Sequence, residues 1–156
     1  CVVAQCCSCN AEVVAIDATC TNIEQCVDVD LRIDTINQTS IDQRMTGINL
    51  HADFARVNIN FWLTPDEACL DNTTGGIVVY DTPPPEDWSF QKANADSETI
   101  KKYLDGRQAK MVRVPYKMNR CVLFDSTYFH ATDDIHFKEG YENRRINCTL
   151  LFGKGL

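Results

Sequence analysis

Eight short segments with the composition of β-strands limit the fold of this 156-residue chain more than any other feature of its sequence. Each segment is rich in β-branched and aromatic residues and is bounded by turn-forming residues, which is typical of strands. Eight short strands predict a mostly β fold, a double-stranded β-helix (jelly roll, cupin-like) with a few short flanking helices. The segments span residues 11–17, 27–36, 48–53, 56–63, 76–80, 109–115, 120–124 and 145–152.

Two short segments predict helical structure. Thr64 is followed by a proline and two acidic residues, a pattern that predicts an N-cap and one helical turn. Residues 97–104 predict a short helix that Ser97 caps and an Asp-Gly pair ends. Residues 83–85 are three prolines, which exclude a helix or a central strand. They indicate a stiff surface connection or, together with Trp88, part of a substrate lid.

One His-x-Asp pair and one distant histidine carry ligands for a metal ion. In an extended strand alternate side chains share a face, so His51 and Asp53 project together while Ala52 faces away. If another strand brings in His130, two imidazoles and one carboxylate occupy one face of an octahedral ion and leave the opposite face open. This donor set suits Fe(II) better than it suits a structural zinc site. His51, Asp53 and His130 are therefore the predicted metal ligands.

The same residues also have a structural interpretation. A His-x-Asp pair can be the end of a surface strand, and the three histidines of the sequence could be scattered by chance. Two of the three, however, fall where the metal site needs them. The third, His136, follows Asp133 and Asp134 in a charged loop and is expected to face solvent. Taken together, these positions favour a metal site.

The order His-x-Asp, distant His and following Arg resembles the Fe(II)- and 2-oxoglutarate-dependent dioxygenases over roughly residues 47–153. Residues 120–130 look like the family's apolar strand that runs into the distal histidine, and residues 145–149 look like its last strand. The resemblance implies a hydroxylase that uses Fe(II), 2-oxoglutarate and dioxygen. Such an enzyme hydroxylates a C–H bond of a peptide or small-molecule substrate and releases succinate and CO2.

An arginine is expected to anchor the far carboxylate of 2-oxoglutarate, because a guanidinium pairs with a carboxylate through two parallel hydrogen bonds. Arg144 and Arg145 compete for this role, and strand alternation places them on opposite faces. Burial of the more apolar face would favour Arg144. The resemblance favours Arg145 with Asn147, since the family carries an Arg-x-polar pair that faces the pocket. Arg145 and Asn147 are therefore the predicted cosubstrate-binding residues, and Arg144 is the second choice to Arg145.

The strand at residues 56–63 alternates between an apolar face and a face that carries Asn58 and Asn60. That second face could lie in water, as in a half-exposed strand. Because the strand follows the His-x-Asp pair, either asparagine could instead line the pocket. Both possibilities stay open.

The first 44 residues form a cysteine-rich segment that contains six of the nine cysteines, at positions 1, 6, 7, 9, 20 and 26. This density is compatible with disulfides, a thiolate metal site or free thiols, and we assign no metal to it. The segment could supply the first strands of a jelly-roll core at residues 45–156. Because the sequence begins with Cys1 instead of methionine, we expect a fragment, a processed form or a trimmed form of a longer chain.

The net charge of −7 argues against a nucleic-acid partner, and no apolar run is long enough to cross a bilayer. The expected partners are a small-molecule or peptide substrate and dioxygen. Localisation and oligomeric state stay open, with the cytoplasm slightly favoured. Two other functions compete with the oxygenase. One is a cupin-like metalloenzyme that does not use 2-oxoglutarate, and the other is a non-catalytic jelly-roll interaction module.

Overall fold

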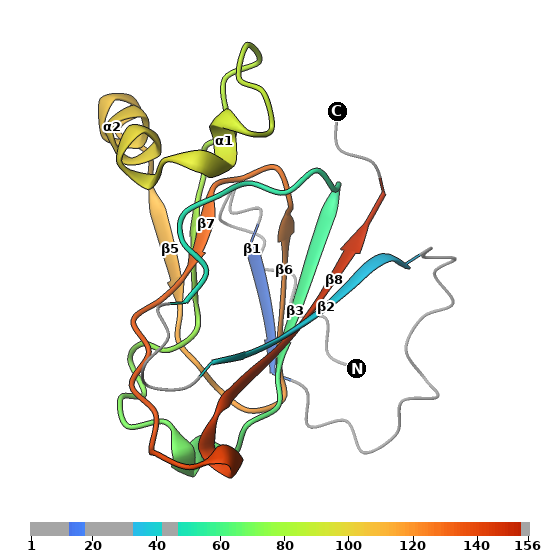
Figure 1. Cartoon of the computed structure of the whole chain (residues 1–156), viewed down its shortest axis with the longest axis vertical. Helices are drawn as coiled ribbons and strands as arrows, with labels where there is room; N and C mark the ends of the chain where they lie inside the picture. Colours follow the sequence, from blue (N-terminus) through green and yellow to red (C-terminus); the bar gives the residue numbers. More distant parts are fainter. Residues whose placement is uncertain (1–12, 18–32, 42–46, 154–156) are drawn as a thin grey trace.

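The computed structural model describes residues 13–17, 33–41 and 47–153 and is mostly β (Figure 1). Its helices are α1 (Lys92–Ala95) and α2 (Ser97–Arg107), with single 3-10 turns at Asp66–Ala68 and Tyr141–Asn143. No helix in this part of the chain has the length and apolar character needed to span a bilayer. The strands are β1 (Val13–Asp17), β2 (Ile33–Ile41), β3 (Val57–Trp62), β4 (Ile77–Tyr80), β5 (Met111–Val114), β6 (Arg120–Asp125), β7 (His130–Thr132) and β8 (Arg145–Phe152).

The strands form two antiparallel sheets. The larger sheet has the order β1-β6-β3-β8-β2, and the smaller sheet has the order β5-β4-β7. From β3 onward the chain passes repeatedly between the sheets, with β3, β6 and β8 in the larger one and β4, β5 and β7 in the smaller one. The mostly β prediction with a few short helices is confirmed at this level.

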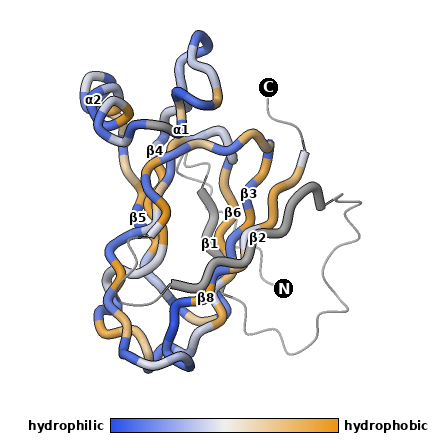
Figure 2. The backbone as a smooth tube through the Cα atoms, viewed as in Figure 1, coloured by the Kyte–Doolittle hydropathy of each residue, from blue (hydrophilic) through white to orange (hydrophobic). Residues whose placement is uncertain are grey.

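A hydrophobic core lies between the sheets and joins β3, β4, β5 and β6. Trp62, Val79 and Val122 are fully or almost fully buried, and Phe137 packs against them from the loop that follows β7. Figure 2 shows apolar stretches along β4 and β6 and more hydrophilic residues at α2. The core therefore fixes the strands that carry the polar residues described below.

A second apolar cluster holds the helices against the loop before β3. Ile100 and Leu104 of α2 pack with Ala52, Ala93 and Phe129, and all five are buried. Ala52 lies between His51 and Asp53, and Phe129 directly precedes His130. Burial of these neighbours fixes the backbone on both sides of the predicted metal ligands.

Several predicted elements differ in extent from the observed ones. The strand predicted at residues 48–53 is reduced to an isolated bridge between His51 and His130. Asp96, and not Ser97, caps α2, since its side chain accepts a hydrogen bond from the Glu98 amide at 3.0 Å. Thr64 caps no helix, because its hydroxyl donates to the carbonyl of Arg144 and accepts from the amide of Ile146. Both α1 and β7 were missing from the prediction.

The N-terminal region contributes two strands to the larger sheet. β1 pairs with β6 and β2 pairs with β8, both antiparallel. β2 lies further along the chain than the predicted strand at residues 27–36. The six cysteines of the first 26 residues lie outside the described residues, and the division at residue 44 stays a prediction. Within the described part of the chain, Cys69, Cys121 and Cys148 have free thiols.

Candidate metal centre

The backbone places His51 and His130 opposite one another. The His51 amide donates to the His130 carbonyl at 3.0 Å, and the His130 amide donates to the His51 carbonyl at 2.8 Å. The two imidazole rings consequently lie with their centroids 4.2 Å apart. One long-range backbone bridge thus joins the His-x-Asp segment to the first residue of β7.

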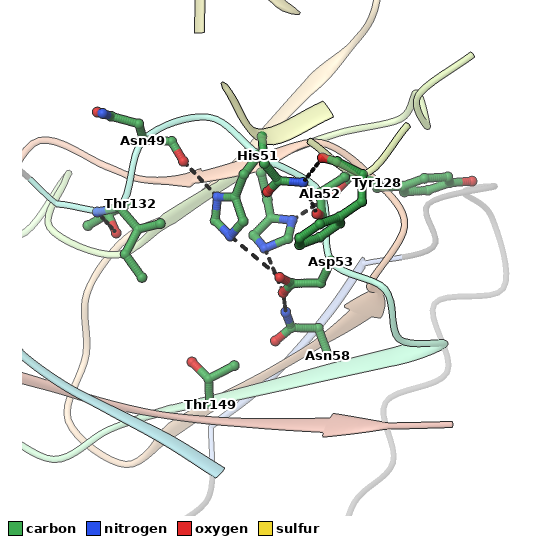
Figure 3. A network of polar contacts seen from close by, with 12 residues as sticks. Asn49, His51, Ala52, Asp53, Asn58, Tyr128, Thr132 and Thr149 are labelled. Carbon is green, nitrogen blue, oxygen red and sulfur yellow. Dashed lines mark hydrogen bonds and ion pairs between the residues drawn. The ribbon is translucent and has the colours of Figure 1, made fainter. Parts of the chain in front are cut away.

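Asp53 completes the group (Figure 3). Its amide donates to the Ser126 carbonyl at 3.0 Å, which holds the loop beside the end of β6. One carboxylate oxygen lies 3.8 Å from Nε2 of His51, and the other lies 3.4 Å from Nε2 of His130. A donor atom from each of the three residues lies within 4.8 Å of the others. Two imidazoles and one carboxylate converge here, which is the donor set of a facial metal site.

Hydrogen bonds fix the tautomer of both histidines. Nδ1 of His51 lies 2.6 Å from the Asn49 carbonyl, and Nδ1 of His130 lies 2.7 Å from the Tyr128 carbonyl. A carbonyl only accepts, so Nδ1 carries the proton in each ring. The lone pair of each neutral imidazole is then on Nε2, which faces Asp53. In metal sites, such hydrogen bonds from the ring nitrogen that does not bind the metal orient the imidazole ligands.

The surroundings also favour the protonation states that bind metal. Burial, together with the repulsion that a protonated His130 would exert, lowers the pKa of His51, so its ring is neutral at neutral pH. Burial alone would raise the pKa of Asp53, but the interactions with His130 and His51 and a hydrogen bond from Asn58 bring it below its usual value. Neutral imidazole and ionised carboxylate are the forms that coordinate a metal. The residues present therefore fit an Fe(II) site.

A row of polar side chains leads from Asp53 along the inner faces of β3 and β8. Nδ2 of Asn58 donates to Asp53 Oδ2 at 3.0 Å, and Asn60 donates to Asn58. Asn147 and Thr149 of β8 both donate to Oδ1 of Asn60, at 2.9 and 2.8 Å. Asn58 and Asn60 are buried, which decides the open question about this face in favour of the interior.

These residues enclose a cavity of about 80 Å³, which we call the triad cavity. This volume has room for several water molecules. Arg145 lies at the other end of the polar row from Asp53, because it precedes Asn147 on β8 and Asn147 is paired with the last residue of β3. The lining consists of Ile48, His51, Asp53, Asn58, Asn60, Gly76, Ile77, His130, Ala131, Thr132, Arg145, Asn147 and Thr149.

Arg145 is a buried cation without a carboxylate partner among the described residues. Its guanidinium donates from Nε to the Gly75 carbonyl at 2.6 Å and from Nη2 to the Gly76 carbonyl at 3.0 Å. Burial lowers its pKa to about 10, so the group stays charged at neutral pH. A buried charge is costly unless an opposite charge compensates it. The end of the cavity is therefore complementary to an anion.

The structure distinguishes Arg145 from Arg144 and from His136, because only Arg145 lines the triad cavity. Arg145 and Asn147 line the triad cavity, whereas Arg144 is absent from its lining and lies over the Tyr141 ring, 5.0 Å from its centroid. His136 is exposed, as its charged loop predicted. The structure thus brings His51, Asp53, His130, Arg145 and Asn147 to one cavity.

In the sequence we assigned no functional role to the glycine pair before β4, whose carbonyls hold Arg145. A Cβ atom on Gly76 would lie 1.9 Å from the Val114 carbonyl oxygen, so only glycine fits there. Gly75 has a φ of 77°, in the region that favours glycine. Two adjacent glycines ahead of a strand were the available signal of this close approach.

No protein-family model matches the sequence, and no similar sequence was found among curated proteins. Among solved structures, the chain is similar to an N-substituted L-amino acid dioxygenase from Burkholderia ambifaria AMMD, with 16% identity and a TM-score of 0.49 over 75% of this chain and 48% of that one. The same enzyme in complex with alpha-KG gives 14% identity and a TM-score of 0.45, over 75% of this chain and 47% of that one. The chain spans about half the length of these structures.

Proposed function

We propose that the protein is an Fe(II)- and 2-oxoglutarate-dependent oxygenase that hydroxylates a C–H bond of a small-molecule or peptide substrate, with release of succinate and CO2. One observation carries the proposal: a convergent His-Asp-His group and a buried arginine, which makes no ion pair with a carboxylate among the described residues, line the same cavity. The first is complementary to a divalent metal ion and the second to an anion. A dicarboxylate that chelates the metal at one end and meets the guanidinium at the other would satisfy both.

The proposed fold is a jelly roll, the scaffold that the family resemblance implies. β2, β8, β3 and β6 are neighbours in the larger sheet, while β7, β4 and β5 are neighbours in the smaller one. The His51–His130 bridge lets the segment before β3 continue the smaller sheet beyond β7. With that segment included, the smaller sheet has four strands and faces the five strands of the larger sheet, and this order supports the double-sheet arrangement.

Three atoms would hold the metal: Nε2 of His51, a carboxylate oxygen of Asp53 and Nε2 of His130. Bound Fe(II) would supply the dioxygen chemistry of the reaction. The protein contributes the rest: Asn58 holds the Asp53 carboxylate, and the carbonyls of Asn49 and Tyr128 hold the imidazoles in the ligating tautomer. Such positioning removes the cost of ordering ligands at the moment of reaction.

Arg145 would bind the far carboxylate of 2-oxoglutarate, with Asn147 beside it and Arg144 as the second choice. The two hydrogen bonds to Gly75 and Gly76 use Nε and Nη2 and leave Nη1 for a ligand. Oδ1 of Asn147 has no hydrogen-bond partner among the described residues, and it is buried. A buried polar atom without a partner is costly, and a bound ligand or water would satisfy it.

The test is Fe(II)-dependent formation of succinate from 2-oxoglutarate in air. Metal-free protein is loaded with Fe(II), and succinate is measured for the wild type and for Asp53→Ala, His130→Ala and His136→Ala. The exposed His136 is the matched control. We expect turnover in the wild type and in His136→Ala, and none in the other two variants. Oxidation of a substrate without 2-oxoglutarate would instead indicate the cupin-like metalloenzyme, and failure to bind Fe(II) would indicate an interaction module.

A further inference from the structure

A second cavity, of about 320 Å³, borders the metal site and is not used by the chemistry described above. We call it the aromatic cavity. Asp53 lines both this cavity and the triad cavity, so the two meet at a predicted metal ligand. Its volume lies at the lower end of the range of about 300–1,000 Å³ that is usual for small-molecule sites. Its lining includes Ala52, Asp53, Phe54, Glu86, Trp88 and Phe90.

Two exposed aromatic rings form part of its rim. Phe54 is 64% exposed and Phe90 is 46% exposed, and their rings meet edge to face with centroids 5.2 Å apart. Deeper in the protein, Trp88 packs against Tyr103 and Phe129 at 5.3 and 6.2 Å between centroids. Grouped apolar side chains that stay exposed beside a cavity mark a binding surface.

The two walls of the aromatic cavity are tied together by one side chain. Nδ2 of Asn94 donates to the Ala52 carbonyl at 3.0 Å and to the Phe90 carbonyl at 2.8 Å. The Ala52 carbonyl belongs to the loop that carries the predicted ligands His51 and Asp53. The Phe90 carbonyl belongs to the segment that carries the prolines and Trp88. The cavity is therefore formed before any ligand arrives, which lowers the entropic cost of binding.

The charged residues in the lining of the aromatic cavity are both negative. Asp53 and Glu86 are the only ionisable residues in its lining, and no lysine or arginine contributes to it. Lys92 lies over the Trp88 ring at 4.7 Å from its centroid, but outside the lining. The lining of the triad cavity, in contrast, contains the cation Arg145. An anionic group would be repelled from the aromatic cavity.

We propose that the aromatic cavity binds an aromatic group of the substrate that carries no negative charge. Its border at Asp53 would bring such a group next to the metal, and Phe54, Phe90 and Trp88 would select it. The assignment as a substrate pocket rests on the proposed oxygenase function. The binding property itself does not, so the two can be tested apart.

The experiment titrates metal-free protein with 2-phenylethanol and, separately, with phenylacetate, a matched pair that differs in charge. The sequence contains two tryptophans, so an NMR spectrum has two indole N–H signals, one from the aromatic cavity and one from a position near Arg145. Trp88 lines the aromatic cavity, whereas the Trp62 ring lies 5.8 Å from the Arg145 guanidinium. We expect 2-phenylethanol to shift the Trp88 signal and not that of Trp62. We expect phenylacetate to bind the aromatic cavity at least about tenfold more weakly.

Phe54→Ala and Phe90→Ala should each weaken binding of 2-phenylethanol by about fivefold or more, because each removes a large apolar contact. Both side chains are exposed, so the variants should fold. Tyr141→Ala is the control, since Tyr141 is 80% exposed and lies outside the cavity. An unmoved Trp88 signal, equal affinity for the two probes or unchanged affinity in both variants would overturn the proposal. If the probe binds as expected but Fe(II) or 2-oxoglutarate does not, the cavity stands as a binding site and the oxygenase function fails.

Discussion

Replacing Arg145 with leucine should weaken binding of the far carboxylate of 2-oxoglutarate and leave binding of its 2-oxo acid end unchanged. The guanidinium is buried and has no carboxylate partner in the described structure, so a ligand carboxylate would be its counter-ion. Removing one partner of a buried, hydrogen-bonded charge pair costs about 2–5 kcal/mol. The affinity for 2-oxoglutarate should therefore fall roughly 30- to 4,000-fold. Fe(II) affinity should not change, because Arg145 is absent from the metal-ligand group.

The effect on folding should be small by comparison. Arg145→Leu removes two hydrogen bonds from a charged donor to Gly75 and Gly76, each worth about 1.5–3 kcal/mol. It also removes the desolvation penalty of a buried ion, which is several kcal/mol in the opposite direction. Because these contributions oppose each other, the variant should stay folded, and thermal unfolding checks this.

The assay is anaerobic calorimetric titration of the Fe(II)-loaded protein with 2-oxoglutarate and with 2-oxobutyrate, which keeps the 2-oxo acid end and lacks the second carboxylate. We expect the variant to lose affinity for the first ligand and to keep its affinity for the second. Arg144→Leu is the control, since Arg144 lies on the Tyr141 ring outside the triad cavity. The reasoning is refuted if Arg145→Leu binds 2-oxoglutarate within about threefold of wild type, or if Arg144→Leu shows the loss instead.

Four other positions have measurable consequences for metal binding and stability. Asn58→Ala removes the amide that donates to Asp53, so Fe(II) affinity should fall about 10- to 100-fold in a chelator competition, and an unchanged affinity would show that Asn58 does not position the ligand. Burial raises the pKa of Tyr116 to about 12, above the value of about 10 in the unfolded chain. Its contribution to stability should be complete below about pH 10 and lost as the pH rises toward 12, because the unfolded chain releases the proton first. Urea unfolding across this range checks the loss, and Tyr116→Phe should not show it; an identical pH dependence in the variant would count against this cause. Gly76→Ala should cost about 1–3 kcal/mol or more because its Cβ would meet the Val114 carbonyl at 1.9 Å, whereas Gly106→Ala in α2 meets no atom within 4 Å and should gain about 0.5–1 kcal/mol. Thermal unfolding compares the two alanine variants, and shifts of the same sign would contradict this account.

The convergence of the predicted ligands could be argued from sequence only in part. His51 and Asp53 are two residues apart, so local extended backbone is enough to direct them to one side. The position of His130 depends on a long-range backbone bridge, which no local pattern encodes. The order of residue types and the family resemblance supplied that step. The roles of these residues as ligands stay a prediction until a metal is measured.

The alternation of polar and apolar residues on β3 did not decide whether Asn58 and Asn60 face the interior or the solvent. Both side chains are buried because the sheets enclose a polar cavity and the amides satisfy one another and Asn147. A hydrophobic pattern that fails in this way is expected at a functional site. Strand alternation places the apolar Trp62 on the same face as the two asparagines, and this was the sequence signal that could have favoured the interior; all three side chains are buried.

The missed elements are short. β7 has three residues and α1 has four, which is too little for any periodicity to register. Tertiary contacts define both. The segment predicted as a strand at residues 48–53 forms only a bridge, because its partner β7 is itself only three residues long. At α2, Asp96 and Ser97 are both good caps, and the extended backbone of Asp96 decides between them.

The most direct test of the central claim is anaerobic titration of the metal-free protein with Fe(II) and then with 2-oxoglutarate, observed through the visible charge-transfer band of the chelate. His130→Ala is measured in parallel, because His130 provides one of the three converging donor atoms. The account predicts a band that saturates with 2-oxoglutarate in the wild type and is absent in the variant. Fe(II) binding without the band, or a band of equal strength in His130→Ala, would contradict it.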